Sequence, residues 1–245
     1  MDCKNLYLNK IFNQIRISLF ILWGLFSTVF YGIGCIVLSL FSRKIARSLG
    51  RLWNKHLLMA GGVKVIVKGV EKLEKGKRYV FIANHSSNLD IPVLFSGLQY
   101  QISFIAKKEL FMIPFFGWGI AAMGHICIDR TNARKARESF TRAIKHLKKE
   151  HISLILFPEG TRSVDGMVGE FKRASFTLAL EAGVQVVPVA IRNTGRILPK
   201  KSFRIRPGTA YLEIFDPIDI TPDMKKADLA SLVHKTVKSS IEKKS

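Results

Sequence analysis

Residues 79–92, YVFIANHSSNLDIP, change from an apolar run to polar residues and then to a helix start, and this change indicates the fold. The run YVFIA, residues 79–83, is rich in β-branched and aromatic residues and predicts a buried strand. Asp90 and Pro92 suit a first helical turn, where the helix dipole stabilises a carboxylate and proline is tolerated. A strand that leads through polar residues into a helix is typical of α/β sheets, in which ligand sites lie beyond the carboxyl ends of strands.

The same alternation of short apolar runs and helical patterns continues along the chain after Gly62. The expected strands are residues 63–67, 79–83, 103–106, 125–128, 152–157, 186–191, 203–206 and 210–215. The expected helices are at about residues 91–98, 132–149, 172–182 and 224–242. This order predicts an α/β domain with a mixed, mostly parallel central sheet flanked by helices. The mixed character is expected because Pro207 and Gly208 predict a hairpin between the last two strands.

No charged residue occurs from residue 17 to residue 42, and this run is long enough for a helix that crosses a bilayer, which takes about 20 residues. A buried core helix rarely needs so long an unbroken apolar run. Basic residues are denser after the run than before it, which predicts that the following domain lies on the cytoplasmic side of the membrane. We expect this membrane to be a bacterial inner membrane. Glycines in the run leave a second option, a helical hairpin with residues 43–59 that enters one leaflet. Residues 1–60 are therefore expected to be a membrane-anchoring helical segment, and residues 61–245 the α/β domain.

The chain has a formal net charge of +21, which is spread over both parts of the sequence. Such a field attracts an anionic membrane surface, phosphorylated substrates or nucleic acid. The sequence has no helix-turn-helix, zinc-finger or RNA-binding motif, so nucleic acid is not expected as a partner. The three cysteines have no C-x-x-C or Cys/His spacing, which indicates reduced thiols rather than a disulfide framework.

His85 and Asp90 form the first candidate pair for chemistry. Five residues apart, they would point about 140° away from each other on one regular helix. They meet only if His85 follows the strand and Asp90 opens the next helix as its N-cap. A carboxylate beside an imidazole fixes its tautomer and stabilises the imidazolium, as in the base and orienter of a catalytic triad. The structural alternative is that Asp90 only caps its helix and His85 only packs.

A second candidate follows the apolar run ISLILF: the segment FPEGTRS, residues 157–163, hereafter the FPEGTRS segment. Its glycine, Gly160, suits a tight turn. Arg162 can bind a carboxylate or a phosphate with two parallel hydrogen bonds. The structural alternative is an ordinary polar turn in which Arg162 forms a salt bridge with Glu159.

Lys107 and Arg130 follow two further expected strands, where their charge suits an anionic group or a developing oxyanion. Each is also explained by a solvated surface charge. Ser86 and Ser87 lack the G-x-S-x-G context of a covalent nucleophile. The sequence has neither a phosphate-binding glycine loop nor a metal-ligand spacing such as H-x-x-x-H, and no metal is expected.

Four blocks, taken in order, resemble the 1-acyl-glycerol-3-phosphate acyltransferase family, the lysophosphatidic acid acyltransferases. They are N-H-x4-D at residues 84–90, G-x-x-x-I-D-R at 124–130, F-P-E-G-T-R-S at 157–163 and V-V-P-V-A-I at 186–191. H-x4-D alone is a weak signal, whereas all four blocks in order are specific. Ala174 departs from the family pattern, which usually has glycine there. His125 and Cys127 depart as well, since small and aromatic residues are common at these positions.

The resemblance implies transfer of a fatty acyl group from acyl-CoA or acyl-carrier protein to the sn-2 hydroxyl of 1-acyl-glycerol-3-phosphate, which gives phosphatidic acid in phospholipid biosynthesis. It implies that His85 is the general base and Asp90 its orienter. The residues implied in binding the acceptor's phosphate and the oxyanion are Lys107, Arg130, Glu159, Gly160, Thr161 and Arg162. The thioester is a co-substrate, and no cofactor is expected.

Two other readings of the sequence remain. A sibling acyltransferase that acts on another lysophospholipid, on glycerol 3-phosphate or on an aminolipid would carry similar blocks. A non-catalytic basic protein that binds an anionic membrane or nucleic acid would explain the charge of +21. It would not explain a histidine, a carboxylate and an arginine at the ends of expected strands.

Overall fold

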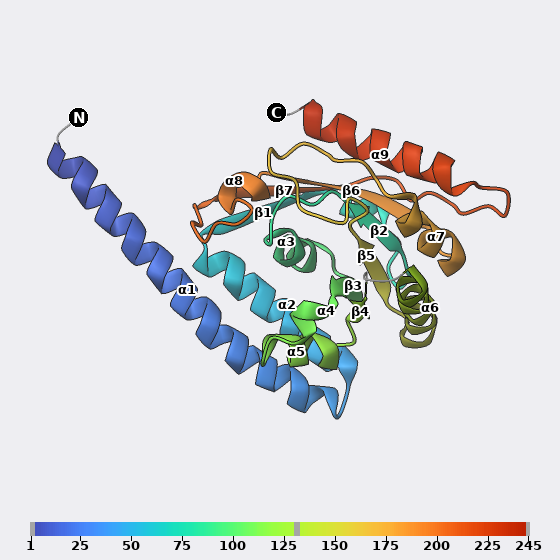
Figure 1. Ribbon diagram of the computed structural model, residues 1–245, viewed down its shortest axis with the longest axis horizontal. Helices are drawn as coiled ribbons and strands as arrows, with labels where there is room; N and C mark the ends of the chain where they lie inside the picture. The colour runs from blue at the N-terminus through green and yellow to red at the C-terminus, as the bar shows by residue number, and fades with distance from the viewer. Residues whose placement is uncertain (1–2, 130–132, 244–245) are drawn as a thin grey trace.

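The computed structural model describes residues 3–129 and 133–243 and shows an α/β domain preceded by two helices (Figure 1). The helices are α1 (Cys3–Ser39), α2 (Arg43–Ala60), α3 (Asp90–Gly97), α4 (Lys108–Phe111), α5 (Phe116–Ala122), α6 (Ala133–Glu150), α7 (Arg173–Ala182), α8 (Thr194–Ile197) and α9 (Lys226–Glu242), with a 3-10 turn at Val70–Lys72. The strands are β1 (Val63–Lys68), β2 (Val80–Ala83), β3 (Ile102–Lys107), β4 (Ile126–Ile128), β5 (Ser153–Leu156), β6 (Val186–Arg192) and β7 (Gly208–Ile214).

Within the described residues, seven strands form one sheet in the order β1-β7-β6-β2-β5-β3-β4. All neighbouring strands are parallel except β6 and β7, which are antiparallel. The predicted mixed, mostly parallel sheet flanked by helices is therefore confirmed. Since β6, β2 and β5 are adjacent, the segments that follow their carboxyl ends meet at one edge of the sheet.

The prediction of a hairpin around Pro207 was wrong. Residues 203–206 are not a strand, and the antiparallel partner of β7 is β6. The backbone of residues 203–206 is bonded elsewhere: the Arg16 guanidinium donates to the Ile205 carbonyl at 2.9 Å, and the Arg206 amide donates to the Ile197 carbonyl. Ile205 is buried as a packing residue and does not pair in the sheet.

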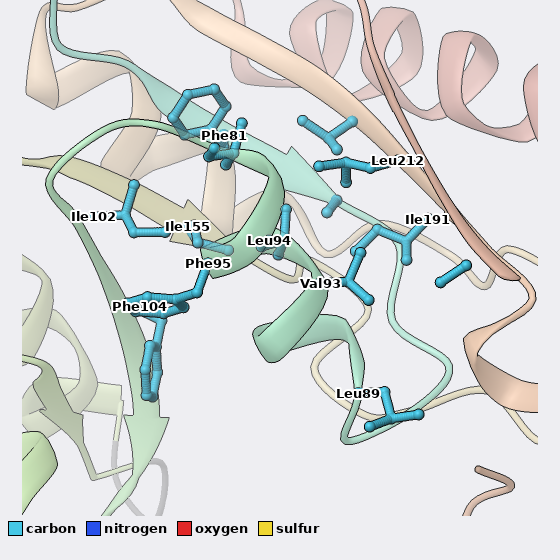
Figure 2. Packing of buried hydrophobic residues seen from close by; sticks show 14 of the residues in the cluster. Phe81, Leu89, Val93, Leu94, Phe95, Ile102, Phe104, Ile155, Ile191 and Leu212 are labelled. Atoms are coloured by element: carbon cyan, nitrogen blue, oxygen red, sulfur yellow. The ribbon is translucent and has the colours of Figure 1, made fainter. Parts of the chain in front are cut away.

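The core lies on both faces of the sheet, because alternate residues of a strand point to opposite sides. In β2 all four residues are buried; Phe81 belongs to one hydrophobic cluster, and Val80 and Ile82 belong to the other. Figure 2 shows the first cluster, in which Leu94 and Phe95 of α3 face the sheet. Both faces of β2 are therefore covered, as is usual for a parallel sheet.

Helices α1 and α2 form a hairpin whose connecting turn is at residues 40–42 (Figure 1). From Ile11 to Ser39, α1 is long and apolar enough to cross a membrane, and only 22% of its most apolar stretch is buried. The turn carries two large apolar side chains, Leu40 and Phe41, which are 79% and 80% exposed. A buried core helix is therefore excluded, and the hairpin presents a long apolar surface.

Candidate active site

The site begins where β2 ends, and Asn84 fixes this point against β6. The side-chain amide of Asn84 donates to the Ile191 carbonyl at 2.9 Å and accepts from the Ile191 amide at 2.8 Å. This pair of bonds continues the pairing of β2 with β6 by one step. His85 is consequently placed just beyond the edge of the sheet.

His85 and Asp90 meet as the sequence predicted. His85 Nδ1 is 2.7 Å from Asp90 Oδ2, and Asp90 is fully buried. The same carboxylate accepts from the amides of Ser86 and Ser87 at 2.8 and 2.9 Å, and from Thr194 Oγ1 at 2.5 Å. Four donors surround the carboxylate, which is how a buried negative charge is stabilised.

The expectation that Asp90 is an N-cap was wrong in detail. Leu89 occupies the cap position, and Asp90 is the first residue of α3. The Asp90 carboxylate faces back toward the loop and accepts from residues that precede it in sequence. Its position therefore orients His85 rather than satisfying the free amides of the helix.

The hydrogen bond to Asp90 fixes which ring nitrogen of His85 carries the proton. A carboxylate only accepts, so Nδ1 holds the hydrogen and Nε2 keeps a lone pair. The ring is stacked on Phe157 with centroids 4.2 Å apart, and the side chain is 20% exposed. His85 is thus held in one orientation and remains reachable from solvent.

Glu159 ties the FPEGTRS segment to the backbone of His85. One carboxylate oxygen accepts from the His85 amide at 2.8 Å, and the other accepts from the Gly169 amide at 3.3 Å. The Ser163 amide donates to the His85 carbonyl at 2.8 Å. Burial raises the pKa of the Glu159 carboxyl group, and the two amide hydrogen bonds act in the opposite direction. Glu159 therefore holds two loops together.

The alternative salt bridge between Glu159 and Arg162 is not formed among the described residues. Gly160 adopts a φ of 73°, a left-handed conformation that glycine tolerates and other residues rarely adopt. This turn leaves Thr161 exposed and Arg162 half-buried at the surface of the site. Arg162 is thus placed near His85 without a carboxylate partner in the described part of the chain.

Lys200 is a site residue that the sequence did not reveal. Its ammonium group donates to the Arg162 carbonyl at 2.5 Å and lies 3.4 Å from Thr161 Oγ1. Thr194, which donates to Asp90, was also missed. Thr194 follows the end of β6, so the rule that directed attention to strand ends could have found it, whereas no spacing pointed to Lys200.

The remaining predicted residues are less closely tied to His85. Lys107 ends β3, is exposed, and lies at the same edge of the sheet as the end of β2, because β2, β5 and β3 are parallel neighbours. Arg130 lies outside the described residues. Lys107 is therefore a candidate for contact with a ligand that extends across the edge.

The fold and the site define a class of protein. A model of the acyltransferase family, described as "Acyltransferase", matches residues 64–192, which contain His85, Asp90 and the FPEGTRS segment. The chain belongs to the acyltransferase family. The family resemblance noted in the sequence is thereby confirmed.

Within this family, the similar proteins include 1-acyl-sn-glycerol-3-phosphate acyltransferases. A chloroplastic one from Arabidopsis thaliana is 37% identical over 163 residues, 66% of this chain and 45% of that protein. The one from Escherichia coli is 30% identical over 206 residues, 84% of this chain and 82% of that protein. The chain spans about half the length of the first plant and algal relatives.

A solved structure is also similar over nearly its whole length. It is the 1-acyl-sn-glycerophosphate acyltransferase from Thermotoga maritima, with a TM-score of 0.82 and 31% sequence identity. The match covers 96% of each chain, so it includes the region of the N-terminal hairpin as well as the sheet.

Proposed function

We propose that the protein transfers a fatty acyl group from an acyl thioester to the sn-2 hydroxyl of 1-acyl-glycerol-3-phosphate and so forms phosphatidic acid. The observation that carries this proposal is the 2.7 Å hydrogen bond between His85 and the buried Asp90 at the end of β2. The similarity to 1-acyl-sn-glycerol-3-phosphate acyltransferases supports the choice of acceptor.

In the proposed mechanism, His85 Nε2 takes the proton from the acceptor hydroxyl as that oxygen attacks the thioester carbonyl. Asp90 stabilises the imidazolium that forms. The tetrahedral intermediate then collapses, the carbon–sulfur bond breaks, and the thiolate leaves and takes the proton from His85. The acyl group passes directly to the acceptor, so the protein needs no covalent intermediate.

Positive groups beside His85 suit the phosphate of the acceptor and the developing oxyanion. Arg162 can bind phosphate through two parallel hydrogen bonds, and Lys200 adds a second charge beside the same turn. Lys107 and Arg130 complete the proposed set. Glu159, Gly160 and Thr161 are proposed to act by shaping the turn that presents Arg162.

Residues 1–60 are proposed to anchor the protein in a membrane, with the catalytic domain of residues 61–245 on the cytoplasmic side of a bacterial inner membrane. The exposed apolar face of α1 and the exposed turn at Leu40 and Phe41 support attachment. Full-length protein in isolated membranes should resist a high-salt wash and dissolve only with detergent. Release by salt alone would show that charge, and not the hairpin, holds the protein.

One experiment tests the proposed reaction. Purified full-length protein is given labelled acyl-CoA or acyl-carrier protein with lysophosphatidic acid, glycerol 3-phosphate, lysophosphatidylcholine or monoacylglycerol. We expect the highest kcat/KM with lysophosphatidic acid, and the two thioesters decide the donor. His85→Ala is the control for catalysis by a contaminant. A higher kcat/KM with another acceptor would assign the protein to a sibling activity, and no transfer to any acceptor would contradict the proposal.

A further inference from the structure

The segment that follows β6 is hydrogen-bonded to both loops of the proposed active site. This segment, residues 194–200, is called the 194–200 strap here; it contains α8 and ends at Lys200. Within the strap, the Leu198 carbonyl accepts a hydrogen bond from Ser87 Oγ at 2.7 Å. At its end, the Lys200 ammonium group donates to the Arg162 carbonyl at 2.5 Å. The strap therefore joins the loop after β2 to the FPEGTRS segment.

Lys200 lies close to the proposed base through a short chain of bonds. Its ammonium group donates to the carbonyl of Arg162, and the next amide along the chain, that of Ser163, donates to the His85 carbonyl at 2.8 Å. One peptide group and two hydrogen bonds thus connect the ammonium nitrogen of Lys200 with the backbone of His85. The positive charge of Lys200 is therefore held beside the turn that presents Arg162.

The ammonium group of Lys200 keeps both a donor and its charge for a ligand. An ammonium group has three donors; one binds the Arg162 carbonyl, and the Thr161 hydroxyl oxygen lies at a longer 3.4 Å. Neither of these partners is charged, and among the described residues neither Lys200 nor Arg162 forms an ion pair. Two cations thus meet at one turn without a carboxylate to neutralise them, which favours an anion.

Phosphate monoesters and phosphate diesters differ in what they offer to these two cations. A monoester has three terminal oxygens and, above its second pKa of about 6, nearly two negative charges. A diester has two terminal oxygens and a single charge. The guanidinium fork of Arg162 can bind two oxygens, so it can satisfy a diester completely. A monoester keeps a third oxygen and a second charge, which suit a point charge such as the ammonium group of Lys200.

We propose that Lys200 selects acceptors that carry a phosphate monoester, by binding the third oxygen and the second charge of that group. This role rests on the proposed transfer to lysophosphatidic acid, which is a phosphate monoester, and it names the residue that disfavours phosphodiester lysolipids. The alternative is a positioning role, in which the bond to the Arg162 carbonyl only holds the turn. A positioning residue affects all acceptors alike, whereas a residue that binds the second charge affects the monoester most.

The test compares lysophosphatidic acid with its monomethyl phosphate ester, which has the same acyl chain, one more methyl group and one charge less. The kcat/KM for each acceptor is measured with full-length protein in neutral detergent micelles, well above the second phosphate pKa. Lys200→Met removes the charge and keeps the length of the side chain. We expect kcat/KM for lysophosphatidic acid to fall about tenfold more than kcat/KM for the ester, the lower end of the value of a hydrogen bond to a charged group, because Lys200 is only half-buried.

Lys201→Gln is the matched control, because it removes a neighbouring charge that is exposed and forms no ion pair among the described residues. The preference for lysophosphatidic acid over the ester should not change in this control, and Lys200→Arg should keep most of it. Equal losses with both acceptors in Lys200→Met would show a positioning role and overturn the proposal, while the proposed function would stand. No transfer by wild type to either acceptor would contradict the proposed function itself.

If Lys200→Met does not fold, Lys200→Gln takes its place, since an amide keeps a donor for the Arg162 carbonyl and lacks the charge. The pH then provides a second readout, because lysophosphatidic acid gains its second charge as the pH rises through about 6 and the ester does not. The ratio of the two kcat/KM values cancels the titration of His85, which serves both acceptors. This ratio should rise with pH in wild type and rise much less in Lys200→Gln. An equal rise in the two proteins would overturn the role of Lys200.

Discussion

His85 and His125 lie at different ends of the sheet and share one kind of aromatic neighbour. Each ring is stacked on a phenylalanine, with centroids 4.2 Å apart for His85 and 4.0 Å for His125. They differ in the partner of Nδ1. For His85 this partner is the Asp90 carboxylate, which accepts a hydrogen bond, whereas His125 Nδ1 lies 3.4 Å from the Phe104 amide nitrogen and 3.3 Å from Ser103 Oγ.

The difference shows that one neighbour decides what a histidine can do. Facing a carboxylate, His85 keeps a lone pair on Nε2 and can serve as a base. His125 has no carboxylate at Nδ1, and its Nε2 is buried, so its ring is not placed to take a proton from a substrate. The sequence already separates the two positions, because only His85 is followed by a carboxylate five residues later, and the tertiary contacts show what that spacing achieves.

The largest expected effect tests the basic role of His85. His85→Ala should lower kcat by about 10²–10⁴-fold, the usual contribution of a positioned general base. His125→Phe should cause a loss at least tenfold smaller, because His125 lies beyond reach of the proposed reaction. Steady-state rates with lysophosphatidic acid in neutral detergent micelles measure both variants. A folded His85→Ala protein with near-normal turnover would contradict the proposed mechanism.

Arg162 gives the next largest effect. Arg162→Ala should lower kcat/KM for lysophosphatidic acid by about 10- to 150-fold, because hydrogen bonds to charged groups are worth roughly 1.5–3 kcal/mol. Arg162→Lys should restore only part of this loss, since a point charge lacks the two-pronged geometry. The kcat/KM for a neutral acceptor such as monoacylglycerol should fall much less in both Arg162 variants. An equal loss with both acceptors would leave Lys200, Lys107 or Arg130 as the phosphate-binding groups.

Acid stability should distinguish the buried His125 from a phenylalanine. The pKa of His125 falls from 6.5 to about 3 on folding, so between these values only the unfolded chain binds the proton. Stability is therefore lost as the pH falls. Between pH 7 and pH 5, wild type should lose about 2 kcal/mol more unfolding free energy than His125→Phe. Urea unfolding in phosphate-free detergent buffer measures the difference, and equal losses would show that His125 does not titrate differently in the two states.

The smallest expected effect concerns Thr194. Thr194→Val removes one of the four donors to Asp90, and should lower kcat about fivefold, given a net value of roughly 1 kcal/mol for one hydrogen bond. The KM for lysophosphatidic acid should change little. Ser86→Ala, which leaves the bond from Thr194 to Asp90 in place, is the matched control; an equal effect would indicate general disruption.

Local sequence was sufficient for most of the sheet and for the centre of the site. Apolar runs located all seven strands of the described chain, and the polar residues after two of them located His85 and the FPEGTRS segment. These features could be predicted because a buried strand needs a continuous apolar run, and because parallel strands bring their carboxyl ends together.

What the sequence did not reveal depends on distant contacts. The run at residues 203–206 has strand-like residues, yet Arg16, 189 positions earlier, takes the Ile205 carbonyl. Helix α5 contains Gly117 and Gly119, which disfavour a helix locally. Gly119 packs closely against α1, since a Cβ added there would lie 3.2 Å from the Cα of Gly32. Close packing against another helix has thus outweighed local propensity.

The carboxylate of Glu159 joins two parts of the site that lie far apart in the sequence. Its two oxygens bind amides that are 84 positions apart, those of His85 and Gly169, and the intervening chain includes three strands and a long helix. Neither amide can leave its acceptor for water without loosening the loop that holds the other. In native-state hydrogen exchange, the His85 and Gly169 amides should therefore become protected or exposed together, as members of one cooperative unit. The histidine and the turn that carries Arg162 would then be lost or regained in a single event, and half-assembled sites would be rare.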